Sequence, residues 1–281
     1  MALEEDFFQT TDGEKLFYRF QPAPSNQNPI LIVHGHGEHS GRYLKFFTHL
    51  KDLQVPLATF DLRGSGRSSG PRVYVSRFED YLNDLSDFIR FLKIRHGVGP
   101  PIRLVGHSLG GLIATAWAHQ NREEISKLIL SSPLFGIPMG RILKALVNLL
   151  NRFTPRLVIR NPVKPLFLTH DPEEVERYKK DPLIQRQISV RLVHEMLRYI
   201  SILSEESLSF PFPVYILMAQ QDFIVNPDAT RKFSLRVQAP DKELESFPGF
   251  FHEIVNEKGQ EKAFERLRYY LVRSQRDGPT L

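Results

Sequence analysis

Ser108 lies in the sequence GHSLGG, residues 106–111, with a glycine two positions away on either side. The apolar run 102–105 precedes this serine and the helical pattern 109–119 follows it, so the serine falls at a turn from strand to helix. A G-x-S-x-G sequence at such a turn is typical of a nucleophile, because a sharp turn between glycines exposes the hydroxyl. An ordinary glycine turn is the alternative.

Two further side chains have the types and the chain order that a nucleophilic serine requires. A serine hydroxyl is a weak nucleophile at neutral pH and needs a histidine base that a carboxylate orients. Asp222 follows the apolar run 214–218, and His252 follows the run 244–247, so both are expected on loops at the carboxyl ends of strands. We therefore predict a catalytic triad of Ser108, Asp222 and His252.

Other carboxylates and histidines compete for these roles. Asp228 and Asp241 also stand between the serine and His252 in the chain. The first falls in the first turn of a predicted helix, and the second precedes a strand, at the wrong end of the sheet. His170 and His194 lie in a segment that is expected to cover the sheet, where a lone histidine is usually a packed or surface residue.

Acyl transfer also needs hydrogen-bond donors for the negative charge that develops on the carbonyl oxygen. In a strand-turn-helix arrangement, one donor is the backbone N–H of the residue after the nucleophile, here Leu109. A second comes from a glycine-rich loop after an earlier strand. The sequence HGHG at 34–37 follows the apolar run 29–33, so we predict the backbone N–H of His36 as this donor.

No metal or cofactor is expected. His34, His36 and His39 are close in sequence, but glycine separates them and they lack the helical spacing of a paired metal site. The glycine-rich stretch 64–70 superficially resembles a dinucleotide-binding loop. Pro71 follows it, however, and no helix pattern begins at the turn.

The elements that must position these residues alternate along the chain. Five apolar runs are typical of buried strands, and they are residues 29–33, 55–60, 102–105, 128–130 and 214–218. Amphipathic helical segments such as 78–94 lie between them. This alternation predicts an α/β fold with a mostly parallel central sheet and helices on both faces.

The alternation stops after the strand that ends near residue 132. From residue 133 to 210 the pattern is mostly helical, and a strand pattern then returns. We predict a core in two parts, residues 1–132 and 211–281, and a helical cap, residues 133–210. The cap is expected over the carboxyl ends of the strands, where open α/β sheets bind ligands.

The composition of the 281-residue chain excludes several classes of function. There is no cysteine, which rules out a thiol nucleophile or a disulfide framework. The net charge of +5 favours anionic partners, but no basic run interleaved with aromatics predicts nucleic-acid binding. The amino terminus lacks the apolar core of a signal peptide, so a cytoplasmic protein is expected.

Five stretches together carry a resemblance to a known family. They are HGHGEHSGRY at 34–43, DLRGSGRSSG at 61–70, GHSLGG at 106–111 and the loops of Asp222 and His252. The chain resembles an α/β-hydrolase of the monoacylglycerol lipase and lysophospholipase group, which is serine aminopeptidase-like. DPLIQR at 181–186 extends the resemblance into the cap.

This resemblance implies a serine esterase that cleaves single-chain glycerolipids, most simply monoacylglycerol to glycerol and fatty acid. A lysophospholipase and a general carboxylesterase are the alternatives within the same fold. A low-turnover ligand receptor or scaffold is an alternative of another class, because a fold does not determine a function.

The cap contains one amphipathic segment, Met139 to Phe153. Its apolar side chains share one broad helical face, whereas Arg141, Lys144 and Arg152 lie on the other. A basic amphipathic helix suits a membrane interface, so a peripheral membrane contact is predicted here. The alternative is a lid helix whose apolar face packs on the protein.

Overall fold

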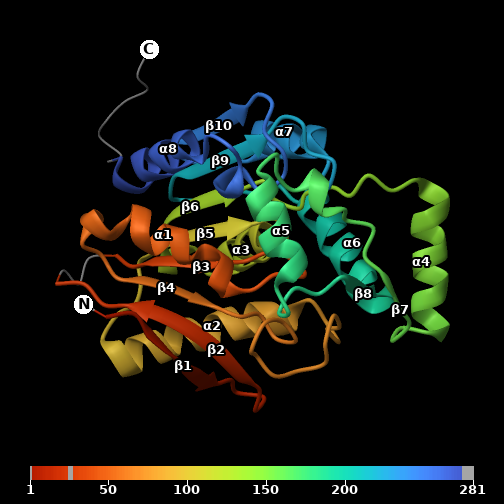
Figure 1. Ribbon diagram of the computed structural model, residues 1–281, viewed down its shortest axis with the longest axis horizontal. Coiled ribbons are helices and arrows are strands. Elements are labelled where there is room, and N and C mark those ends of the chain that lie inside the picture. The colour runs from red at the N-terminus through yellow and green to blue at the C-terminus, as the bar shows by residue number, and fades with distance from the viewer. Residues whose placement is uncertain (1, 25–27, 274–281) are drawn as a thin grey trace.

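The computed structural model describes residues 2–24 and 28–273. An eight-stranded sheet forms its centre, with the strand order β1-β2-β4-β3-β5-β6-β9-β10 (Figure 1). The strands are β1 (Glu4–Gln9), β2 (Lys15–Gln21), β3 (Ile30–Val33), β4 (Leu57–Phe60), β5 (Ile102–His107), β6 (Ile125–Ser131), β9 (Val214–Ala219) and β10 (Lys242–Phe247). The first two pairings, β1 with β2 and β2 with β4, are antiparallel, and all the others are parallel.

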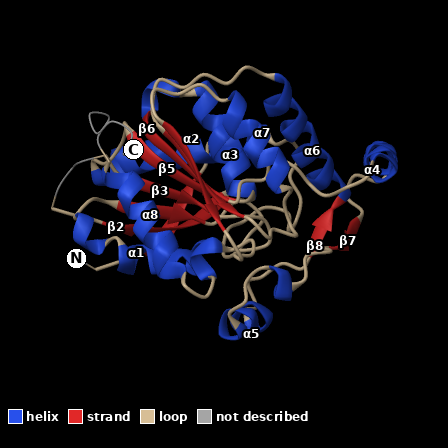
Figure 2. Ribbon diagram, turned by 90° about the horizontal axis from the view of Figure 1, so that it is seen from above, coloured by secondary structure: helices blue, strands red, loops and turns tan. Residues whose placement is uncertain are grey.

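Helices cover both faces of this sheet (Figure 2). One face carries α2 (Glu79–His96), α3 (Leu109–Gln120) and α7 (Pro227–Arg236), and the other carries α1 (Leu44–His49) and α8 (Gln260–Val272). Successive residues of β3 point into the two different cores: Ile30 and Ile32 into one, Leu31 and Val33 into the other. Because both faces are dry, the strands are continuously apolar rather than alternating. The predicted α/β architecture is confirmed.

The segment between β6 and β9 lies over one end of the sheet. It contains α4 (Arg141–Phe153), α5 (Pro172–Lys180) and α6 (Val190–Glu205). The helix α4 stands apart from the sheet, at the right in Figure 1. Strand β6 ends at Ser131 and β9 begins at Val214, close to the expected limits of the cap, 133–210, although the division into domains stays a prediction.

Two short strands in this segment were not predicted. They are β7 (Val158–Arg160) and β8 (Gln187–Ser189), which pair antiparallel. Each is three residues long, and the two lie far apart in the chain, so neither has the length over which an alternating pattern can be recognised. The segment is otherwise helical, as α4, α5 and α6 make up most of its regular structure, and the small sheet is an addition to the expected pattern.

Within residues 2–24 and 28–273, no helix combines the length and the apolar character needed to cross a membrane.

Candidate active site

Ser108 occupies the turn between β5 and α3 in a conformation that non-glycine residues rarely adopt, with φ 52° and ψ −118°. Its N–H donates to the carbonyl oxygen of Ser131 over 3.0 Å, and its own carbonyl oxygen accepts from the N–H of Leu134 over 3.0 Å. These bonds tie the turn to the end of β6 and keep the backbone strained.

The flanking glycines are required by close backbone approach. A Cβ on Gly106 would lie 2.5 Å from the Gly110 carbonyl oxygen, and a Cβ on Gly110 would lie 2.1 Å from that of Val33. Both distances are impossible for real atoms. The GHSLGG sequence is therefore a crowded turn in which glycine at 106 and 110 avoids a clash with neighbouring backbone.

Asp222 and His252 meet at the carboxyl ends of β9 and β10. The Nδ1–H of His252 donates to Oδ2 of Asp222 over 2.7 Å, and both side chains are buried. The other carboxylate oxygen, Oδ1, accepts the backbone N–H groups of Ile224 and Val225 over 2.8 and 2.9 Å. These bonds fix the orientation of the carboxylate. Because Nδ1 of His252 carries the proton of this bond, Nε2 is the ring nitrogen that can accept another proton.

The charges of this pair favour its ionised forms. Burial alone lowers the pKa of His252, but the Asp222 carboxylate and its hydrogen bond outweigh burial and raise that pKa above its usual 6.5. Burial alone raises the pKa of Asp222, but His252 and the two backbone donors lower it below its usual 3.8. Asp222 therefore stays negative at neutral pH and stabilises a positive His252.

The neighbouring ring of His107 connects this pair to the serine turn. The rings of His107 and His252 are 4.9 Å apart between centroids, and His107 directly precedes Ser108 in the chain. The Nδ1–H of His107 donates to the Ser131 carbonyl oxygen over 3.1 Å. Burial lowers the pKa of His107 to about 4, so this imidazole is neutral beside His252.

The loop after β3 lies directly against the serine. A Cβ on Gly35 would be 3.1 Å from the Cβ of Ser108. This contact brings the backbone of His36 to the same side of the sheet as the amino terminus of α3. Leu109 is the first residue of α3, and the first backbone N–H groups of a helix have no partner within the helix. The loop that contains His36 and the first residue of α3 thus flank Ser108, and their role as oxyanion donors stays a prediction.

The competing residues have other partners. Asp228 is exposed in the first turn of α7 and accepts from Arg231 over 2.8 Å. Asp241 accepts from the Tyr215 hydroxyl over 2.6 Å at the opposite end of the sheet. His170 lies 3.0 Å from Glu257. His194 bonds to Asn148 over 3.0 Å, which joins α6 to α4.

The three histidines after β3 turn to different partners. Nε2 of His34 accepts the backbone N–H of Leu62 over 2.9 Å, and Nε2 of His39 lies 2.9 Å from Oδ2 of Asp181. The ring of His36 lies 3.3 Å from the carbonyl oxygen of Gln187. Among the described residues, no group of three or more His, Asp or Glu side chains could hold a metal ion.

A buried ion cluster beneath His252 was missed in the sequence. Glu38 accepts the backbone N–H of Gly35 and the hydroxyl of Tyr43, each over 2.6 Å. Arg42 lies between two carboxylates, with Nε 3.3 Å from Glu38 and Nη2 bonded to Glu253. The motif GEHSGRY contains two of these three charges, and its unusual density of polar residues after a buried strand was the available signal.

The cap segment 181–187 also holds the loop after β3, which the sequence did not indicate. The backbone N–H of Gln185 donates to the Gly37 carbonyl oxygen over 2.8 Å, and its side-chain amide donates to that of Gly64 over 2.6 Å. With the contacts of His36 and His39, these bonds fix the loop from the cap side. The DPLIQR motif thus has a structural role at the edge of the candidate site.

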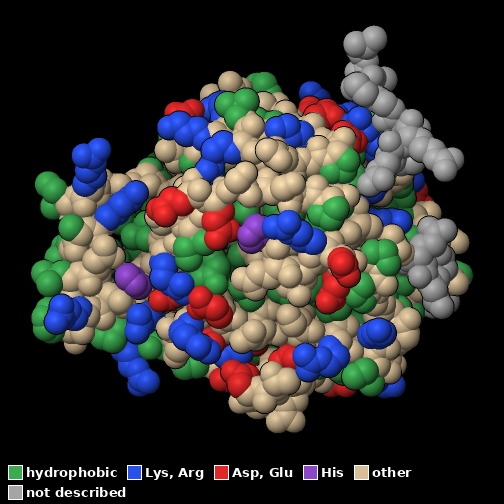
Figure 3. Space-filling model, turned by 180° about the vertical axis from the view of Figure 1, so that it is seen from behind, with side chains coloured by type: hydrophobic (Ala, Val, Ile, Leu, Met, Phe, Trp, Pro, Cys, Tyr) green, Lys and Arg blue, Asp and Glu red, His purple; other side chains and the backbone are tan. Residues whose placement is uncertain are grey.

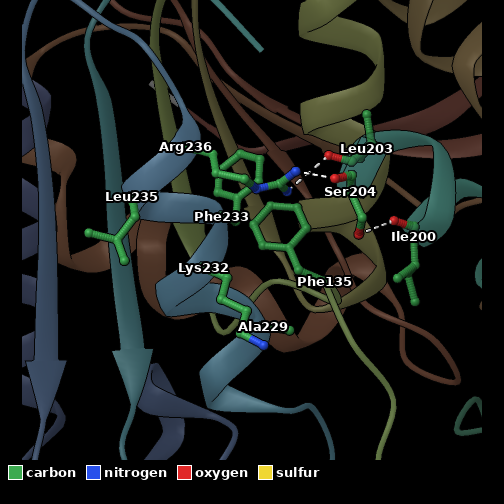
Figure 4. A pocket seen from close by; sticks show the side chains of 9 residues that line it. All are labelled: Phe135, Ile200, Leu203, Ser204, Ala229, Lys232, Phe233, Leu235 and Arg236. Atoms are coloured by element: carbon green, nitrogen blue, oxygen red, sulfur yellow. Dashed lines mark hydrogen bonds between the residues drawn. The ribbon is translucent and has the colours of Figure 1, made fainter. Parts of the chain in front are cut away.

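A cavity of about 400 Å³ lies elsewhere, between α6 and α7 (Figure 4). Its wall is mainly apolar, with Phe135 stacked on Phe233 at 3.9 Å between ring centroids. The Arg236 guanidinium at its rim is bonded to the carbonyl oxygens of Leu203 and Ser204. No histidine or carboxylate lines this cavity, so it lacks the base and the acid of a serine-histidine-aspartate site.

Comparison with known proteins identifies the family and similar folds. The model of a family described as serine aminopeptidase, S33, matches residues 24–259, a range that contains Ser108, Asp222 and His252. The protein YnbC of Escherichia coli (strain K12) is 30% identical over 276 residues. That match covers 96% of the chain but 47% of YnbC, so the chain spans about half the length of this relative.

Two solved structures are similar over nearly the whole chain. The monoacylglycerol lipase of Paleococcus ferrophilus has a TM-score of 0.82 and 29% identity, and the match covers 97% of this chain and 99% of that one. A soluble variant of the monoglyceride lipase of Saccharomyces cerevisiae, in complex with a substrate analog, has a TM-score of 0.84 and 27% identity. The match covers 97% of this chain and 96% of the yeast one.

Proposed function

The chain belongs to the serine aminopeptidase, S33, family of α/β-hydrolases, and from this membership we propose that it is a serine esterase that cleaves monoacylglycerol. The observation that carries the proposal is the 2.7 Å bond between Asp222 and His252 beside the strained turn of Ser108. A turn of this kind has a cost in stability, and a chemical use of the serine hydroxyl explains why it is kept.

In the proposed reaction, Nε2 of His252 takes the proton of the Ser108 hydroxyl while the serine oxygen attacks the ester carbonyl carbon. The backbone N–H groups of His36 and Leu109 stabilise the resulting oxyanion. His252 then gives its proton to the departing glycerol oxygen, which leaves the acyl group on the serine. A water molecule, deprotonated by His252 in turn, attacks the acyl-enzyme and releases the fatty acid.

Asp222 contributes by orientation and charge. It accepts Nδ1–H, so Nε2 faces the serine as a base, and it stabilises the imidazolium that forms in each half of the reaction. Neutral His107 adds no opposing positive charge next to that imidazolium, because its pKa of about 4 keeps it uncharged.

The substrate class is argued from the relatives and from the surface of the cap. Two similar solved proteins are described as a monoacylglycerol lipase and a monoglyceride lipase, which favours a single-chain glycerolipid over a peptide for this chain. A lysophospholipase shares the same chemistry and differs only in the head group. A scaffold without turnover is disfavoured by the complete set of nucleophile, base, acid and donors.

A substrate panel tests the proposal. We expect hydrolysis of p-nitrophenyl esters with a preference for medium or long chains, and faster release of fatty acid from monoacylglycerol than from lysophosphatidylcholine. A faster rate on lysophosphatidylcholine would instead assign a lysophospholipase, and a preference for acetyl esters a general carboxylesterase. No hydrolysis of any ester would leave a receptor or scaffold.

A peripheral membrane contact through α4 is part of the proposal. Val147 is the one α4 residue that is buried, whereas Ile142 is 89% exposed and Phe153 is 70% exposed. Figure 3 shows hydrophobic side chains along the outer edge of this helix, at the left, with Lys and Arg side chains beside them. An amphipathic helix that turns its apolar face away from its own protein suits insertion between lipid head groups.

Charge reversal on α4 tests this contact. Each cation near an anionic surface contributes roughly 1 kcal/mol, so Arg141→Glu with Lys144→Glu should weaken vesicle binding by more than about tenfold. The measurement is cosedimentation with vesicles of phosphatidylcholine and phosphatidylserine at low salt. Hydrolysis of a short water-soluble ester should be unchanged.

The matched control is Lys258→Glu with Lys262→Glu near α8, which changes the net charge equally at exposed positions. An equal loss in both double variants would mean that overall charge, not α4, attracts the vesicles. Unchanged vesicle binding of the α4 variant would mean that α4 is a lid helix without a membrane contact.

A further inference from the structure

A second pocket, of about 260 Å³, lies within the cap, where β7 and the turn after it meet the end of α5. Its polar lining comes from five side chains. They are those of Arg160, Asn161, Tyr178, Lys179 and Arg186. None of these residues belongs to the candidate triad or to the loop after β3, so the proposed reaction leaves this pocket unused. We call it the cap pocket.

The cap pocket offers hydrogen-bond donors and positive charge, and no carboxylate lines it. The Arg160 guanidinium has no ion pair or hydrogen bond with any described residue. The side-chain oxygen of Asn161 accepts the backbone N–H of Val163 over 3.1 Å, which leaves its NH₂ group to donate. Arg186 donates to the carbonyl oxygens of Tyr178 and Lys179, and this holds its charge at the pocket wall.

Among the cationic side chains that line the pocket, Lys179 is the one with an ion pair to a described carboxylate. Lys179 pairs with Glu176 over 2.7 Å at an exposed position, where such a pair contributes little. The chain contains no Asp or Glu from residue 125 to residue 170, a stretch that includes all of α4 and β7. The surroundings of the pocket on the β7 side are thus uniformly cationic.

The floor of the pocket is the buried Tyr178. Its hydroxyl has no hydrogen-bond partner within the part of the chain that the structure describes. Burial and the nearby Glu253 carboxylate raise the pKa of Tyr178 to about 12, so the phenol is protonated at neutral pH and can donate to an anion. On the core side the Arg42 guanidinium lies 5.1 Å from the ring centroid, and its charge is paired with Glu38 and Glu253.

We propose that the cap pocket binds a phosphate group, free or as the head group of an anionic lipid. A phosphate carries several strong acceptor oxygens in a tetrahedral arrangement, which match donors that converge from two arginines, a lysine, an amide and a phenol. A carboxylate would leave some of these donors without a partner. The volume also accommodates a phosphate together with an attached glycerol.

The position of the pocket fits a lipid source. Val158 and Ile159 of β7, next to Arg160, are 40% and 44% exposed, and β7 follows directly after α4. A lipid whose chains meet this apolar surface would bring its phosphate to the pocket. This part of the inference rests on the proposed membrane contact, whereas the phosphate chemistry of the pocket does not.

The test compares two double variants with the same change in net charge. Arg160→Gln with Lys179→Gln removes two donors of the pocket, and Lys164→Gln with Lys180→Gln removes two neighbouring cap charges that do not line it. A soluble arm measures the binding of inorganic phosphate and glycerol 3-phosphate by ³¹P NMR titration. A vesicle arm compares phosphatidylcholine vesicles that contain phosphatidic acid with vesicles given the same surface charge by oleate.

We expect the pocket variant to lose at least about tenfold in affinity, since each charged hydrogen bond contributes on the order of a factor of ten. Loss in the soluble arm identifies a site for free phosphate esters. Loss of the preference for phosphatidic acid in the vesicle arm alone identifies a lipid head-group site. Equal losses in both variants, or no binding in either arm of the wild type, would overturn the proposal.

Melting temperature and hydrolysis of a short soluble ester should be the same in both variants, because neither pair contacts the triad. These readouts also separate this inference from the proposed function. A wild type without esterase activity would contradict the reaction but would leave the phosphate titration interpretable.

Discussion

Replacing Ser108 by alanine is expected to lower ester hydrolysis by about 10⁵- to 10⁶-fold while the protein stays folded. The hydroxyl makes no hydrogen bond with another described residue. Its removal should therefore lower turnover and hardly change the free energy of unfolding. The turn itself can relax little, because its backbone is held by Ser131 and Leu134 on the neighbouring strand and loop. The measurement is turnover of a p-nitrophenyl ester, with the melting temperature as the check on folding.

Ser132 provides a matched control. It also has a positive φ, 41°, and it follows the neighbouring strand β6, with a buried hydroxyl that has no hydrogen-bond partner among the described residues. Ser132→Ala should therefore keep nearly full turnover. A fluorophosphonate should label Ser108 in the wild type and in Ser132→Ala, and should label nothing in Ser108→Ala. Near-normal turnover in purified Ser108→Ala protein would refute the nucleophile.

The parts of the fold that the sequence predicted are those with a strong local signal. The strands between β3 and β9 were recognisable because burial on both faces makes them continuously apolar. The serine turn was recognisable because three backbones crowd it, and only glycine at 106 and 110 avoids a clash. In each case a single physical requirement acts on a few consecutive residues.

The features that the sequence missed depend on residues that are distant in the chain. Arg42 and Glu253 are 211 positions apart, and the pairing of β7 with β8 joins segments of three residues each. Neither leaves a periodic pattern. The amphipathic character of α4 was evident, but the direction of its apolar face was not, because the same pattern fits a packed lid and an exposed helix. That direction depends on where α6 contacts α4.

The loops that carry Asp222 and His252 depend both on local sequence signals and on contacts between residues distant in the chain. Asp222 and His252 were placed by the rule that loops at the carboxyl ends of parallel strands converge, which holds for any order of intervening segments. The bonds that orient them are local for Asp222, from Ile224 and Val225. For His252 the supporting contacts come from His107, far away in the chain. The proximity of Asp222 and His252 could therefore be predicted from the sequence, whereas the contact of His252 with His107 could not.

Asp222→Asn is expected to have the second largest effect, a loss of turnover on the order of 10⁴-fold or somewhat less. An amide at this position can offer its NH₂ to the ring instead of accepting from it, which favours the tautomer with the proton on Nε2. His252 then cannot take the proton of the serine. The backbone donors of Ile224 and Val225 also fix the amide oxygen toward themselves, which turns the NH₂ group toward the ring.

The pH profile distinguishes this explanation from a general loss of structure. The base must be neutral, so kcat/KM rises with pH through the pKa of free His252. The Asp222 carboxylate raises the pKa of His252 above 6.5. Asparagine carries no charge, so the pKa of His252 should be lower in Asp222→Asn. The acidic limb of the remaining activity should therefore move to lower pH. Unfolding or misfolding would lower the whole profile without moving that limb.

Asp228→Asn and Asp241→Asn are the controls for the position of the acid. The first removes an exposed ion pair with Arg231, which contributes at most about 1 kcal/mol to stability. The second removes the negative charge that faces the Tyr215 hydroxyl and pairs with Arg273 at the far end of the sheet, so it should lower the melting temperature and leave the acidic limb unmoved. If either control lowered turnover more than Asp222→Asn, Asp222 would not be the acid. If the acidic limb of the kcat/KM profile were at the same pH in Asp222→Asn and in the wild type, the carboxylate would act on the fold rather than on His252.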